Sequence, residues 1–173
     1  LNIPNNSLVI GSYGGELSFD IEFVKQEIPK LLDKKSDLFF IFMNIKAFTN
    51  HERCLFLPGT SDSNYKVEFI NTCDAFLHAR DYGETFGLSV LEFASRNKQI
   101  IAYDDYYLQS NHLLGGRNHF LYLKGNCFCY SNKNELDDIL FTANALVALP
   151  VSLIISLCLL YFLKETFCQS KKV

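Results

Sequence analysis

The sequence predicts an α/β domain in which a single, mostly parallel sheet is flanked by helices. Short runs that are apolar at every position alternate along the chain with segments whose apolar residues recur at helical spacing. Strands that are apolar on both faces are typical of a parallel sheet covered by helices on both sides. Hydrophobic residues make up 49% of the 173 residues and charged residues 20%, which excludes a disordered chain and suffices for one domain.

The first half of the predicted domain holds three strands and two helices. A helix is expected over residues 19–34, where Pro29 should kink or divide it. A second helix is expected over residues 61–72, capped by Ser61 or Ser63. The strands are residues 7–11 (SLVIG), 38–43 (LFFIFM) and 54–57 (CLFL).

The second half continues the same alternation. A helix is expected over residues 85–95 with Thr85 as its cap, and Asn132 or Asn134 caps a last helix. The strands are residues 75–79 (AFLHA), 99–102 (QIIA) and, with a weaker signal, 120–123 and 127–130. Because ligands of such sheets bind at the carboxyl ends of the strands, a site is expected in the loops that follow them.

The composition changes after residue 142. Residues 143–163 carry no charged side chain, and their length matches the roughly 20 helical residues that cross a bilayer core. The sequence therefore predicts a domain over residues 1–142, a hydrophobic C-terminal transmembrane helix and a polar tail over residues 164–173. A wholly buried C-terminal helix is the alternative. Since no signal segment is visible, we expect a cytosolic domain anchored at its C-terminus, although counting positive charges places the tail itself in the cytoplasm.

The six cysteines and four histidines do not form a metal-binding pattern. The closest pair is Cys127 and Cys129, and no histidine lies at ligand spacing beside it, so we expect no metal site and reduced cysteines. His78 and His119 lie in apolar runs, which is typical of core residues. The net charge of −3 disfavours a nucleic-acid partner, because such binding depends on Lys and Arg at phosphates.

The loop that follows the strand at residues 75–79 is the richest in potential ligand-binding groups. Gly83 and Gly87 allow its backbone to turn sharply. The main-chain N–H groups of Phe86, Gly87 and Leu88 fall in the first turn of the expected helix, where they lack helical partners. Together with the helix dipole, these groups form a site for phosphate.

Two carboxylates flank this turn. Glu84 precedes it and can accept hydrogen bonds from sugar hydroxyls, while Glu92 lies about two helical turns further on. With about 3.6 residues per turn, the two share roughly one side of the element. Their separation suits the two ends of an extended ligand better than a single acid–base pair.

Residues 73–104, CDAFLHARDYGETFGLSVLEFASRNKQIIAYD, resemble the donor-binding core of retaining glycosyltransferases of the GT-B fold, family 4-like (glycosyl transferases group 1). That family carries a Glu, seven residues and a second Glu in an E-x-F-G-L-x-x-x-E context, which here runs from Glu84 to Glu92. The similarity is looser but colinear over residues 8–140. It covers only the C-terminal, donor-binding half of a two-domain enzyme, and implies a single Rossmann-like sheet.

The resemblance also implies roles for the matched residues. Glu84 would be the catalytic residue that contacts the transferred sugar, and Glu92 would hold the ribose hydroxyls of the nucleotide. The donor is a nucleotide-sugar and the acceptor is unknown; no cofactor is implied, and transfer retains configuration, usually without a metal, with the leaving diphosphate stabilised electrostatically. The other residues implied to bind the substrate are Gly14, Gly15, Phe86, Gly87 and Leu88.

Two cations that the family usually carries are missing here. Family members place an Arg shortly after the first strand and a Lys a few residues later, both on the diphosphate, where this chain has Ser12 and Leu17. Lys46 and Arg80, at the ends of other strands, are candidates to replace them as substrate-binding residues. The acceptor-binding half is also absent, so we expect a chain that opens with Leu1 to be a fragment of a longer protein.

Three functions therefore compete. The first is the donor domain of a glycosyltransferase, and the second is a catalytically degenerate, membrane-anchored remnant that acts as a binding module. The missing cations and the missing half favour the second. The third, a nicotinamide-binding domain, is weak because Gly11-Ser-Tyr-Gly-Gly is not G-x-G-x-x-G, and Asn44 and Lys46 stand where a ribose-binding acid is needed.

Overall fold

The computed structural model describes residues 1–84, 86–104, 119, 123 and 127–146, and in this part of the chain six strands form one parallel sheet. Its strand order is β3-β2-β1-β4-β5-β6. The chain places β2 and β3 on one side of β1 and then crosses to the other side, where β4 pairs with β1 in parallel. Such a switch point opens a crevice at the carboxyl ends of the strands. The strands are β1 (Leu8–Tyr13), β2 (Leu38–Met43), β3 (Cys54–Leu57), β4 (Ala75–His78), β5 (Gln99–Tyr103) and β6 (Phe128–Tyr130).

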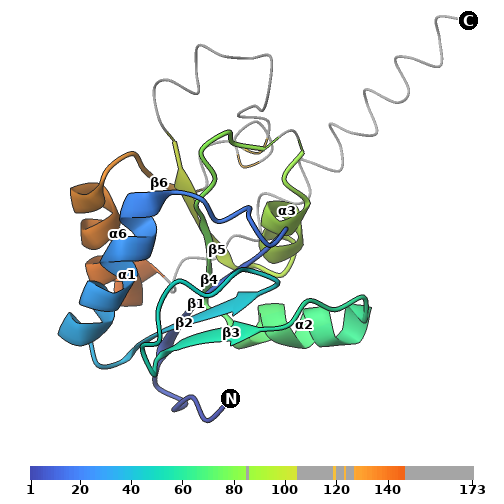
Figure 1. Ribbon diagram of the computed structural model, residues 1–173, viewed down its shortest axis with the longest axis horizontal. Helices are drawn as coiled ribbons and strands as arrows, with labels where there is room; N and C mark the ends of the chain where they lie inside the picture. Colours follow the sequence, from blue (N-terminus) through green and yellow to red (C-terminus); the bar gives the residue numbers. More distant parts are fainter. Residues whose placement is uncertain (85, 105–118, 120–122, 124–126, 147–173) are drawn as a thin grey trace, which may run out of the picture.

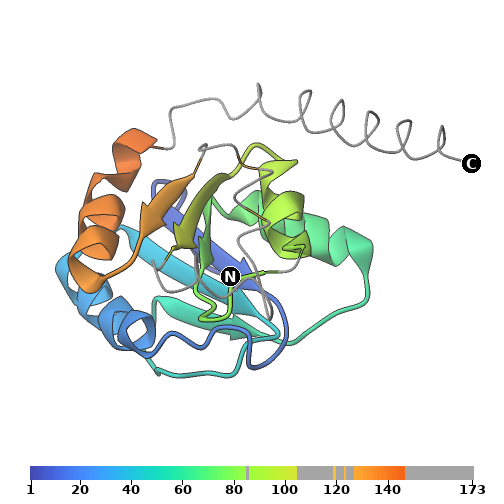
Figure 2. The ribbon, with the colours of Figure 1, turned by 90° about the horizontal axis from the view of Figure 1, so that it is seen from above.

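Helices cover both faces of this sheet (Figures 1 and 2). On one face lie α1 (Glu22–Lys34) and α6 (Lys133–Leu146), and on the other lie α2 (Ser63–Thr72) and α3 (Leu88–Ala94). Each face has its own buried cluster: Ile28 of α1 and Leu136 of α6 belong to one, and Phe93 of α3 belongs to the other. The predicted parallel sheet between two helical layers is therefore confirmed.

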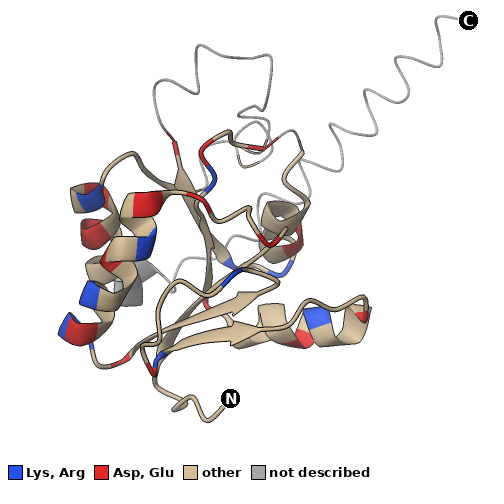
Figure 3. Cartoon of the chain, in the orientation of Figure 1, with Lys and Arg blue, Asp and Glu red and all other residues tan. Residues whose placement is uncertain are grey.

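The described strands carry no charged residue. Figure 3 shows Lys and Arg together with Asp and Glu on the helices and loops, whereas the strands carry neither. The strands could be predicted from sequence for this reason, because a strand buried on both faces leaves no position for a charge.

The predicted strands agree with the structure to within one residue at each end, with two larger differences. The first strand extends beyond the predicted residue 11 to Tyr13, so it delivers Ser12 and Tyr13 to the carboxyl edge. The strand predicted over residues 120–123 is wrong at Leu123, which is helical and fully buried; residues 120–122 lie outside the described residues.

Pro29 does not divide α1, which continues unbroken from Glu22 to Lys34. A proline inside a helix costs about 3 kcal/mol. Burial of one apolar face of α1 against the sheet outweighs this cost, and the apolar residues of that face are Val24, Ile28, Leu31 and Leu32.

The start of α2 differs from the prediction, while that of α6 agrees with it. Asp62, between the two serines that were expected to cap α2, is the residue whose carboxylate accepts the Asn64 N–H at 2.8 Å. Asn132 caps α6 as predicted, since its side-chain oxygen accepts the N–H groups of Asn134 and Glu135 at 3.0 and 3.2 Å.

The predicted C-terminal transmembrane helix lies almost wholly outside the described residues. α6 reaches Leu146, a few residues into the uncharged segment, and residues 147–173 are not described. Among the described helices, none has the length and apolar character needed to cross a bilayer.

Candidate functional site

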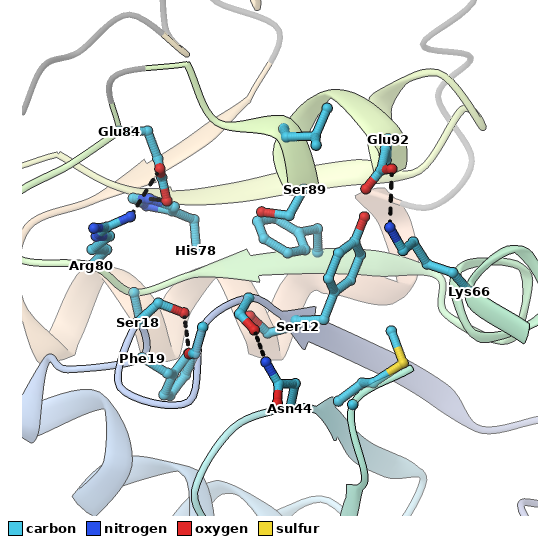
Figure 4. A pocket seen from close by; sticks show the side chains of 18 of the residues that line it. Ser12, Ser18, Phe19, Asn44, Lys66, His78, Arg80, Glu84, Ser89 and Glu92 are labelled. Atoms are coloured by element: carbon cyan, nitrogen blue, oxygen red, sulfur yellow. Dashed lines mark hydrogen bonds and ion pairs between the residues drawn. The ribbon is translucent and has the colours of Figure 1, made fainter. Parts of the chain in front are cut away.

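A pocket of about 670 Å³ opens at the carboxyl edge of the sheet, where β1 and β4 separate at the switch point. Its walls come from segments far apart in the sequence, as Figure 4 shows. The first half of the chain contributes Ser12, Tyr13, Gly14, Gly15, Ser18, Phe19, Met43, Asn44, Gly59, Thr60, Ser61 and Lys66. The loop after β4, with the ends of the elements that it joins, contributes Phe76, His78, Ala79, Arg80, Glu84, Leu88, Ser89 and Glu92.

Glu84 lies at one end of this pocket, between two basic side chains (Figure 4). Its Oε2 accepts a hydrogen bond from an Arg80 guanidinium nitrogen at 3.1 Å, and its Oε1 lies 3.6 Å from His78 Nε2. Burial by itself would raise the pKa of the Glu84 carboxyl, but His78 and Arg80 together outweigh it and hold this pKa below its usual value. Glu84 is therefore a negative charge at neutral pH.

His78 is the last residue of β4 and is almost fully buried, with 3% of its side chain exposed. Neither ring nitrogen makes a hydrogen bond, and the ring centroid lies 4.7 Å from that of His119. The main chain at this point is anchored, because the buried Tyr130 hydroxyl donates to the His78 carbonyl at 2.7 Å. The prediction of a core histidine is correct for burial, but His78 also lines the pocket beside Glu84.

Glu92, on α3, lies at the opposite end of the pocket (Figure 4). Its Oε1 is 3.5 Å from Lys66 Nζ, whereas its Oε2 is buried and makes no hydrogen bond. Partial burial raises the pKa of the Glu92 carboxyl above its usual value. Beside it, the Lys66 ammonium lies 5.5 Å from the centre of the Tyr13 ring, whose buried hydroxyl also makes no hydrogen bond.

The loop after β1 forms a third wall and is tied to the loop after β2. Asn44, at a positive φ of 58°, directs its side-chain amide to the Gly14 carbonyl at 2.7 Å. Ser18 Oγ donates to the Gly15 carbonyl at 2.7 Å. A Cβ on Gly14 would lie 2.4 Å from Ser18 Oγ, whereas one on Gly15 would meet no atom within 4 Å. Gly15 thus leaves open space, while the space beside Gly14 is filled by Ser18.

The turn into α3 depends on Gly87, which precedes the helix at a left-handed φ of 73°. The predicted cap, Thr85, lies outside the described residues, and α3 begins at Leu88 rather than at residue 85. The first helical hydrogen bond runs from the Leu91 N–H to the Gly87 carbonyl. The N–H groups that precede this bond are those of Leu88, Ser89 and Val90, two residues later than predicted.

Six of the nine residues predicted to bind or act on a substrate line the pocket: Gly14, Gly15, Arg80, Glu84, Leu88 and Glu92. The other three, Lys46, Phe86 and Gly87, are not among the lining residues. Lys46 is exposed, and its main-chain N–H donates to the Glu16 carbonyl. In addition to Arg80, one other cation lines the pocket among the described residues, and it is Lys66 of α2. Sequence reasoning missed it because no local motif surrounds it.

The described residues contain no group of three His, Cys, Asp or Glu side chains placed to hold a metal ion. The charged side chains of the pocket are instead two carboxylates and two cations in matched pairs. This arrangement can accept hydrogen bonds from hydroxyl groups at either end.

No protein-family model and no curated protein matches the sequence, but solved structures do. The C-terminal domain of a glycosyl transferase group 1 family protein, LpcC from Francisella tularensis, is 17% identical with a TM-score of 0.57, over 80% of this chain and 75% of that one. HepE from Anabaena, in complex with UDP and glucose, is 14% identical with a TM-score of 0.68, over 97% and 49%. WaaG, a glycosyltransferase involved in lipopolysaccharide biosynthesis, is 15% identical with a TM-score of 0.56, over 80% and 38%.

At these identities the likeness establishes the fold. The chain has the fold of the C-terminal domain of GT-B glycosyltransferases, as the residue pattern around Glu84 and Glu92 implied. It spans about half the length of HepE and little more than a third of WaaG.

Proposed function

We propose that this chain is the donor-binding domain of a retaining glycosyltransferase, which binds a nucleotide-sugar whose sugar the assembled enzyme transfers to an acceptor. One observation carries the proposal: Glu84 and Glu92 lie at opposite ends of a single pocket at the switch point of the sheet. An extended ligand with hydroxyl groups at both ends fits this arrangement, because each carboxylate accepts hydrogen bonds from hydroxyls. The structure of HepE with UDP and glucose on the same fold supports the choice of ligand.

In this proposal Glu92 binds the ribose hydroxyls and Glu84 binds the transferred sugar. The diphosphate lies between them, close to Gly15 and to the N–H groups at the start of α3. As the bond between the sugar and the diphosphate breaks, negative charge develops on the diphosphate and positive charge on the sugar. Fixed dipoles stabilise the former, and ionised Glu84, held by Arg80, stabilises the latter.

The other half of the enzyme would supply what this pocket does not. Transfer requires an oriented acceptor and exclusion of water from the reacting bond. We infer that both come from an acceptor-binding domain, in this protein or in a partner.

The proposal is tested by titrating the chain with UDP-glucose and GDP-mannose in a calorimeter. We expect saturable binding of one of them, weakened at least about tenfold in Glu92→Ala, because a hydrogen bond to a charged group contributes about 1.5–3 kcal/mol. Glu52→Ala is the matched control, since Glu52 is exposed and precedes β3 at the other edge of the sheet. If neither nucleotide-sugar binds at millimolar concentration, the proposal is wrong.

A second candidate, a non-catalytic donor-binding module, is favoured by the charges of the pocket. Among the described lining residues, both cations are already paired with carboxylates: Arg80 with Glu84, and Lys66 with Glu92. A diphosphate therefore meets no uncompensated positive side chain in the empty pocket. Detection of sugar transfer or donor hydrolysis by the chain would exclude this candidate.

We further propose that residues 143–163 anchor the domain to a membrane on its cytosolic side, as their uncharged composition suggests. The full chain should then float with phospholipid vesicles in a density gradient, whereas a chain ending at Leu146 should not. Flotation of both chains, or of neither, would contradict the proposal.

A further inference from the structure

We infer that Lys66 is the cation that binds the diphosphate of the donor, and that it is held by Glu92 until the ribose of the donor takes its place. This inference rests on the proposed function and adds to it a residue on α2 that no sequence motif marks. It assigns the pocket a ligand-driven exchange of partners: the ammonium leaves Glu92 for phosphate as ribose hydroxyls arrive at Glu92.

The contact between Lys66 and Glu92 has the geometry of a pair that separates easily. The Nζ to Oε1 distance is 3.5 Å, compared with about 2.7–2.9 Å for a strong charge-assisted hydrogen bond. Both side chains are about 30% exposed, so water screens their attraction. Lys66 also lies 5.5 Å from the Tyr13 ring centre, which supports the ammonium on the pocket side of α2.

Glu92 has an unused acceptor ready for a hydroxyl group. Its Oε2 is buried and makes no hydrogen bond, and the buried hydroxyl of Tyr13, another lining residue, makes none either. A buried polar atom without a partner costs free energy that a ligand recovers by supplying one. Two neighbouring ribose hydroxyls can donate to both oxygens of Glu92, and this displaces Lys66 from Oε1.

The charges explain why Lys66, rather than Arg80, is the cation that moves. Arg80 donates to Glu84 at 3.1 Å, and this shorter pair is retained in our proposal because Glu84 must stay ionised beside the sugar. A diphosphate brings negative charge into a pocket whose described charged side chains cancel. Release of Lys66 from Glu92 brings one ammonium group into contact with the phosphate without disturbing Arg80, in a chain where Ser12 and Leu17 supply no cation.

The inference predicts different effects on the binding of two ligands that differ only in the diphosphate. We compare binding of uridine with UDP, and of guanosine with GDP, by saturation-transfer NMR and calorimetry. In Lys66→Ala the affinity for the nucleoside diphosphate should fall about tenfold, because a charge-assisted contact is lost. The affinity for the nucleoside should stay equal or rise, because Lys66 no longer competes for Glu92.

Three further measurements complete the experiment. Lys66→Arg should retain diphosphate binding, Lys34→Ala on the exposed end of α1 should leave both affinities unchanged, and the salt dependence of diphosphate binding should weaken in Lys66→Ala. The inference is wrong, while the proposed function stands, if Lys66→Ala lowers the affinities for the nucleoside and for the nucleoside diphosphate by the same factor. The same holds if it lowers neither affinity. If the wild-type chain binds neither ligand of either pair nor any nucleotide-sugar, the proposed function itself is overturned and the inference with it.

Discussion

The adjacent glycines of the β1–α1 loop should respond in opposite ways to the same substitution. Neither Gly14 nor Gly15 has a positive φ, so alanine fits both backbones. The Cβ of Gly14→Ala would lie 2.4 Å from Ser18 Oγ and would push that hydroxyl off the Gly15 carbonyl, which it now meets at 2.7 Å. Loss of this exposed hydrogen bond costs about 0.5–1 kcal/mol, or about 1–4 °C in Tm.

Gly15→Ala should leave stability unchanged or slightly raised, because its Cβ meets no atom within 4 Å and the unfolded chain loses entropy. If a phosphate approaches this backbone, however, the new methyl group occupies its place and the affinity for the nucleotide-sugar falls about tenfold. Gly14→Ala should lower Tm without this loss of affinity.

Thermal unfolding and calorimetric titration of the same samples measure both effects. Ser18→Ala is the control, because it removes the obstructing hydroxyl: in that background, Gly14→Ala should cost nothing further. The reasoning is refuted if Gly14→Ala is equally destabilising with and without Ser18. The placement of phosphate near this loop is refuted if Gly15→Ala binds the donor as tightly as the wild type.

The two carboxylates of the pocket should affect stability in opposite directions as the pH changes. Because the pKa of Glu84 is held below its usual value of 4.5, its ionised form stabilises the fold above that pH. Glu84→Gln should therefore lower Tm at pH 7, and the difference should shrink as the pH falls below about 4.5; a difference that persists unchanged at pH 3 would contradict this. The pKa of Glu92 is raised by burial, so its ionised form destabilises the empty domain. Glu92→Gln should have an equal or higher Tm at pH 7 and no gain below about pH 4.5, and a clear loss of Tm at pH 7 would show that the Lys66 pair contributes more than the burial costs.

The elements with the strongest one-dimensional signal could be predicted from the sequence. Residues 38–43 and 54–57 were predicted at the bounds of β2 and β3, because a strand apolar at every position is explained by burial on both faces. The ends of helices were harder. Ser61, Asp62 and Ser63 are all good caps, and only the path of the chain from β3 selects Asp62.

The local part of the site could also be predicted, and the part built by tertiary packing could not. Glu84 and Glu92 belong to one short segment, so their spacing along the chain already placed them on either side of the turn that joins the loop to the helix. Lys66 and Asn44 reach the same pocket from α2 and from the loop after β2, and their positions depend on the strand order across the switch point. Lys46 was predicted from its place at the end of a strand and is not among the lining residues, since the end of a strand alone does not say which side chains point into the crevice.

The central claim is that one extended donor lies across this pocket from Glu92 to Glu84. Chemical-shift mapping of the 15N-labelled chain with the bound nucleotide-sugar tests it most directly. The account predicts saturable shifts of the main-chain amides of Gly15, Glu84, Ser89 and Glu92 in a single binding event. Shifts confined to one end of the pocket, or to a surface away from it, would contradict the account.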